Sequence, residues 1–108
     1  MKENQVLRRR FSENLVAYGL EDGPLDLDHL GSSDMGNVSH VLPTIHPYLA
    51  ICPLDTPGHS TAFRDAAVSE AADDATLFAA TLVAQTAYEL FADPSLVEAA
   101  WAEFRATA

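Results

Sequence analysis

The fold is decided by residues 71–91, which read AADDATLFAATLVAQTAYELF. Apolar side chains recur at helical spacing on almost every side of this run, so a helix here has hardly any polar face. Its uncharged part, residues 75–88, is too short to cross a bilayer and is interrupted by threonine and glutamine. We therefore predict a buried helix of a water-soluble protein, sandwiched between a sheet and other helices.

Further helices are predicted on both sides of this run. Apolar residues recur every four positions over residues 2–19, and Gly19 follows as a stop signal. Residues 60–108 are expected to be helical, with Asp93 as a natural N-cap and Pro94 at the first position of the last helix. A short helical turn capped by Ser32 or Ser33 is expected ahead of Pro43.

One strand is predicted, over residues 48–54, which read YLAICPL. Its continuous apolar character is typical of a strand buried on both faces, as in a mixed or parallel sheet. A single strand has no partner for its backbone, so one or two strands here would complete a larger sheet. The prediction is an α/β fold, mostly helical in this portion, with residues 1–108 as one unit. It divides into a helix (1–19), a connector and active-site loop (20–47), a strand (48–54) and helices (60–108).

The charge of the chain excludes some classes of partner. The chain has sixteen acidic residues and six lysines and arginines, which gives a formal net charge of −10. A nucleic-acid partner is not expected, because phosphate binding needs a basic face and only residues 8–10 offer three arginines together. Cys52 is the only cysteine, which fits a reducing, cytoplasmic setting. Neither a secretory signal nor a membrane anchor is expected.

Candidate functional residues gather in residues 31–48, GSSDMGNVSHVLPTIHPY, and around His59. Polar and metal-capable side chains set between glycines and prolines are typical of a loop that presents chemistry. The spacing of His40 and His46 suits zinc, but prolines interrupt it and no second close pair of ligands exists, so a closed structural site is not expected. His59 follows the predicted strand, where α/β proteins bind ligands. It is expected to be either a ligand or catalytic group, or a capped, hydrogen-bonded structural residue.

These motifs resemble the C-terminal part of the catalytic domain in metallopeptidase family M-twenty. The order Gly-Ser-x-Asp-Met-Gly-Asn, Ile-His-Pro and Gly-His-Ser carries the resemblance, which is strongest over residues 30–92. Among aminoacylases, aminobenzoyl-glutamate hydrolases and β-alanyl-lysine-type dipeptidases, the last two branches are the most similar. The resemblance implies a hydrolase with two divalent metal ions, usually zinc, in which a glutamate base activates a bridging water.

The resemblance also implies roles for individual residues. His59 matches the last metal-binding histidine of the family. Ser33, Asp34 and Asn37 match the active-site loop that precedes it, which shapes the substrate end or supports the metal shell. His46 is a weaker candidate for a group that faces the substrate. The family's His-x-Asp segment and paired glutamates have no counterpart in this sequence, so the isolated chain is expected to be inactive and to contain no catalytic residue.

The resulting hypothesis is the C-terminal segment of a metal-dependent amidohydrolase or dipeptidase acting on an N-acyl amino acid or small dipeptide. Its partners would be that substrate and a second copy of the chain, bound through exposed apolar surface. The alternative is a non-catalytic helical interaction or dimerisation module, which the missing ligands and the very apolar helix favour.

Overall fold

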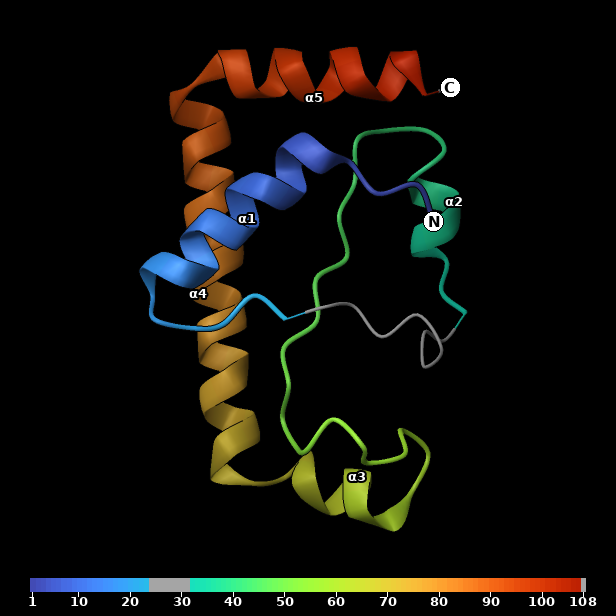
Figure 1. Ribbon diagram of the computed structural model, residues 1–108, viewed down its shortest axis with the longest axis vertical. Coiled ribbons are helices and arrows are strands. Elements are labelled where there is room, and N and C mark those ends of the chain that lie inside the picture. Colours follow the sequence, from blue (N-terminus) through green and yellow to red (C-terminus); the bar gives the residue numbers. More distant parts are fainter. Residues whose placement is uncertain (24–31, 108) are drawn as a thin grey trace. The chain divides into compact units, whose positions relative to one another are not determined.

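The structure is a computed structural model, and it describes residues 1–23 and 32–107. The helices of the described residues are α1 (Gln5–Ala17), α2 (Met35–Val38), α3 (Thr61–Ala66), α4 (Glu70–Ala92) and α5 (Pro94–Ala106), as Figure 1 shows. They belong to two compact units. One comprises Met1–His46 and the chain from Leu82 onward, the other comprises Pro47–Thr81, and α4 contributes to both.

The predicted strand over residues 48–54 is wrong. This segment forms bends and turns, and the residues that the structure describes contain no strand at all. Tyr48 is 58% exposed and Leu54 is 87% exposed, so burial on both faces is wrong as well. A strand is stable only beside a second strand, and Pro53 lacks the N–H group needed to pair with one. The described residues are therefore mainly helical, and the sheet of the predicted α/β fold is not observed.

The helix predicted over residues 2–19 is present as α1. The Asn4 side chain accepts a hydrogen bond from Leu7 N and caps the first turn. Phe11 and Leu15, one turn apart, are the buried apolar residues of its inner face. Just beyond the end of the helix, Gly19 has a φ of 80°, which lies in the left-handed region that glycine tolerates.

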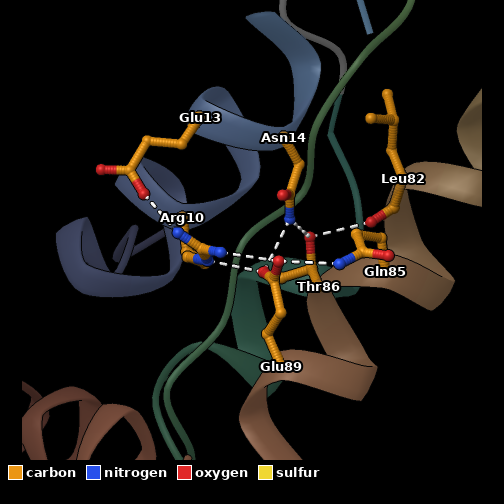
Figure 2. Close-up of polar contacts among 7 residues, drawn as sticks. All are labelled: Arg10, Glu13, Asn14, Leu82, Gln85, Thr86 and Glu89. Carbon is orange, nitrogen blue, oxygen red and sulfur yellow. Dashed lines mark hydrogen bonds and ion pairs between the residues drawn. The ribbon is translucent and has the colours of Figure 1, made fainter. Parts of the chain in front are cut away.

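A polar cluster joins α1 to the second half of α4, as Figure 2 shows. Arg10 donates two hydrogen bonds to the carboxylate of Glu89, at 2.5 and 2.6 Å. Asn14 donates to the same carboxylate at 2.9 Å and to the hydroxyl of Thr86 at 3.1 Å. Gln85 donates a further bond to Glu89 at 2.8 Å. Four donated bonds therefore converge on one carboxylate that is only 14% exposed.

The start of α5 confirms its predicted signals. The Asp93 carboxylate accepts a hydrogen bond from Ser95 N, and Pro94 occupies the first turn. Because Ser95 donates both its hydroxyl and its backbone N–H, the pKa of Asp93 is lowered. Farther along, Trp101 packs edge-on against Phe104, with ring centroids 5.5 Å apart.

Helix α5 also caps the first turn of α1. The carboxylate of Glu103 accepts hydrogen bonds from Gln5 N at 2.8 Å and from Val6 N at 3.0 Å. These N–H groups have no partner within α1, and a negative charge is favoured at the N-terminal end of a helix. Contact between α1 and α5 thus includes a charge-assisted cap supplied from the far end of the sequence.

We predict that Glu103→Ala lowers the free energy of unfolding by about 1 kcal/mol, the usual cost of a lost N-terminal cap. Glu98→Ala is the matched control, because it removes an exposed glutamate from the same helix. Urea denaturation followed by circular dichroism measures both. Equal losses in the two variants would contradict the capping role.

The predicted burial of α4 is only partly observed. Leu82 and Thr86 are buried, whereas Leu77, Tyr88 and Phe91 are 68%, 67% and 89% exposed. By length and composition, α4 is the one helix in the described ranges that could also span a membrane, and 11% of its most apolar window is buried. Core helices of soluble proteins pass the same test. In the unit that contains Leu82, the second half of α4 therefore carries Tyr88 and Phe91 as exposed apolar side chains.

Candidate functional site

The start of α2 brings three of the predicted site residues together. Ser33 Oγ accepts a hydrogen bond from Met35 N at 3.2 Å, which makes Ser33 the serine that caps this turn. Asp34 occupies the N-cap position without a side-chain cap, and its carbonyl accepts from Asn37 N at 2.8 Å. Ser33, Asp34 and Asn37 are all exposed. Their hydroxyl, carboxylate and amide groups form one polar turn that is exposed to solvent.

The residue that follows this turn is buried. Ser39, directly after α2, is 0% exposed, and its hydroxyl donates to the Gly36 carbonyl at 2.7 Å and accepts from Lys2 N at 2.9 Å. Farther on, the carbonyl of Thr44 accepts from Asn4 N at 3.0 Å. Segment 32–46, which we call the candidate loop, is thus attached to the N-terminal segment at two points.

His46 lies at the end of the candidate loop and is half-buried. It belongs to the same compact unit as α2 and α5. It comes two residues after Thr44, the second attachment point. It therefore follows, along the same candidate loop, the polar turn formed by Ser33, Asp34 and Asn37.

His59 belongs to the other unit, Pro47–Thr81. It is exposed and directly precedes Ser60, whose hydroxyl accepts from Phe63 N at 3.1 Å and donates to the Pro57 carbonyl at 2.7 Å. This serine both caps α3 and closes the turn that carries the histidine. His59 thus lies in a defined turn ahead of a helix, but not after a strand, because the predicted strand is not formed.

The described donors do not make a metal site by themselves. Among residues 1–23 and 32–107, no three histidine, cysteine, aspartate or glutamate side chains gather within reach of one ion. A catalytic zinc usually takes three protein ligands, and His59 supplies one imidazole. Cys52 is a half-buried free thiol. The described residues therefore do not fit a complete zinc site, and no catalytic step is derived through one.

The exposed polar turn at Ser33, Asp34 and Asn37, next to the buried Ser39, is the candidate site among the described residues. Comparison with curated proteins shows that the chain is 36% identical over 110 residues to the Xaa-Arg dipeptidase of Mus musculus. The alignment covers 94% of this chain and 24% of that protein. It is 34% identical over 110 residues to the Xaa-Arg dipeptidase of Homo sapiens, with the same coverage. No protein-family model matches the chain, and no solved structure matches it.

These similarities support a peptidase family and a peptidase-like function. The chain spans about a quarter of the length of both relatives. The alignment covers 94% of the chain. Both the candidate loop and the turn that carries His59 therefore lie within the aligned region.

Proposed function

We propose that this chain is the C-terminal segment of a metal-dependent amidohydrolase or dipeptidase. The enzyme would cleave the amide bond of an N-acyl amino acid or small dipeptide with metal-activated water. The observation that carries the proposal is the similarity to two dipeptidases over 94% of the chain. The exposed polar turn at Ser33, Asp34 and Asn37 supports it, because such a turn offers donors and acceptors to a small polar substrate.

In this proposal the described residues have distinct roles. Ser33, Asp34 and Asn37 contact the substrate, and His46 is a weaker candidate for a substrate-facing group. His59 is one of the ligands of a site that holds two zinc ions. The remaining ligands and the glutamate base belong to the rest of the enzyme, so the isolated chain is inactive. The enzyme would act in the cytoplasm on small molecules, without binding nucleic acid or membranes.

The test is a chimera in which this chain replaces the matching stretch of the mouse Xaa-Arg dipeptidase. We expect His59→Ala in an active chimera to lower the bound zinc and to reduce hydrolysis of an arginine-terminated dipeptide by at least about tenfold. His40→Ala is the matched control, since it removes another exposed histidine. Unchanged metal content and turnover in the His59 variant would overturn the role of this residue.

A second measurement is independent of whether the chimera folds. The native protein is captured from its source cells with an antibody to this chain, and its intact mass and sequence are determined. A several-fold heavier chain with a His-x-Asp segment and paired glutamates supports the hydrolase. A mass near 11.6 kDa contradicts it.

The second candidate function is a non-catalytic helical interaction module. The exposure of Tyr88 and Phe91 on α4 favours it, because large apolar side chains gathered on one surface mark protein interfaces. Such a module would self-associate through α4. A monomeric chain at high concentration, measured by sedimentation, together with no binding of an apolar dye, would count against it.

A further inference from the structure

We propose that Ser39 is a positioning residue for the candidate loop. Its buried hydroxyl ties α2 to the N-terminal segment and so holds Ser33, Asp34 and Asn37 in the orientation that the substrate requires. This inference rests on the proposed hydrolase function and adds to it a residue that does not itself touch the substrate.

The hydroxyl of Ser39 uses both of its hydrogen-bonding roles. It donates to the Gly36 carbonyl within its own turn and accepts from Lys2 N, 37 residues away in the sequence. Ser39 and Leu82 are the largest side chains that are fully buried in the described residues. Because the Ser39 side chain is fully buried, removing its hydroxyl leaves two backbone groups without their partner.

The segment to which Ser39 attaches is itself held firmly. The Asn4 side chain donates to the Ala100 carbonyl of α5 at 2.9 Å, and Asn4 is 4% exposed. The Lys2 ammonium donates to the Thr107 carbonyl just beyond α5 at 2.8 Å. The Ser39 hydroxyl therefore connects the candidate loop, through residues 2–4, to the last helix of the chain.

Helix α2 cannot hold this orientation alone. It has four residues, and a single helical turn has little intrinsic stability in water. Asp34 makes no side-chain cap, and α2 has no buried residue. The orientation of the polar turn thus depends on the residues after it, and Ser39 is the first of these that is buried.

The first experiment compares Ser39→Ala with Thr86→Ala by hydrogen exchange on the 108-residue chain. Thr86 is a matched control: its buried hydroxyl also donates to a carbonyl, that of Leu82, and accepts a bond from Asn14, but it lies on α4. We expect Ser39→Ala to speed exchange in residues 35–42 about tenfold and to leave α5 unchanged. Thr86→Ala should not speed hydrogen exchange specifically in residues 35–42.

The second experiment places both variants in the dipeptidase chimera. Ser39→Ala is expected to raise KM about tenfold with zinc content unchanged, because the substrate-facing turn is misplaced while the metal site is not. Thr86→Ala should leave KM unchanged. If Ser39→Ala does not fold, Ser39→Cys retains the size with weaker hydrogen bonds and should give an intermediate effect in both measurements.

Three results would overturn the inference. Equal exchange rates in residues 35–42 for Ser39→Ala and Thr86→Ala would show that the Ser39 hydroxyl does not attach the candidate loop to the N-terminal segment. Faster exchange there with an unchanged KM would show that the attachment does not position a substrate, while the hydrolase function stands. An inactive chimera with the unaltered segment counts against the hydrolase function instead, and the inference falls with it.

Discussion

Replacing Leu82 with alanine is expected to lower the free energy of unfolding by about 3 kcal/mol. Leu82 lies on the inner side of α4 and is 0% exposed, the largest apolar side chain buried to this degree in the described residues. The substitution leaves a cavity in a small core, since Phe11, Leu15 and Ala100 are the other buried apolar residues described in its unit. A small domain has few kcal/mol of net stability, so this loss is a large share of the total.

Val83→Ala is the control for this prediction. Val83 is next to Leu82 on the same helix but is 56% exposed, so its truncation should cost only a small fraction of that amount. Urea denaturation at neutral pH, followed by helical circular dichroism, measures both variants. Comparable losses would mean that α4 is not packed through its Leu82 side.

Replacing Glu89 with glutamine is expected to cost about 2 kcal/mol at neutral pH. Hydrogen bonds from Arg10, then from Gln85 and Asn14, lower the pKa of Glu89 from 4.5 to about 2. The lowered pKa alone corresponds to about 3 kcal/mol. The side chain of Arg10 is 33% exposed, however, and solvent screens part of that interaction.

The pH dependence of this effect has a definite sign. Because the pKa of Glu89 is lower in the folded state, its contribution is complete above about pH 4.5 and is lost as the pH falls toward 2. The difference in stability between the wild type and Glu89→Gln should therefore shrink over this range. Denaturation curves at a series of pH values measure it, with the exposed Glu98→Gln as the control. A difference that stays constant down to pH 2 would contradict the assignment.

The helices were predictable because their signals are local. The four-residue repeat of Leu7, Phe11 and Leu15, and the pair Asp93 and Pro94, depend only on neighbouring residues, and α1 and α5 are present as expected. The strand over residues 48–54 was not predictable, because an apolar run becomes a strand only when a second strand pairs with it. The burial of α4 was overestimated for the same reason. Apolar residues on a helix are buried only where another part of the protein packs against them.

The candidate site divides in the same way. A serine cap ahead of α2 was predictable, but only as Ser32 or Ser33, and the structure shows that Ser33 makes it. The similarity to dipeptidases supports the peptidase relation that the loop motif suggested. The role of Ser39 was not predictable. Its partner Lys2 lies 37 residues away, and nothing nearby in the sequence separates this serine from Ser32 or Ser33.

The bonds from residues 2–6 to α5 have a consequence for how the chain folds during synthesis. Asn4 and Ala100 are 96 residues apart in the sequence, and Lys2 and Thr107 are 105 apart. Nearly the whole segment must leave the ribosome before α1 can meet its cap at Glu103. Such distant contacts close a long loop at an entropic cost, which slows folding. Until then, the side chains that are buried in the folded unit, such as Phe11 and Leu82, are exposed to chaperones and to aggregation.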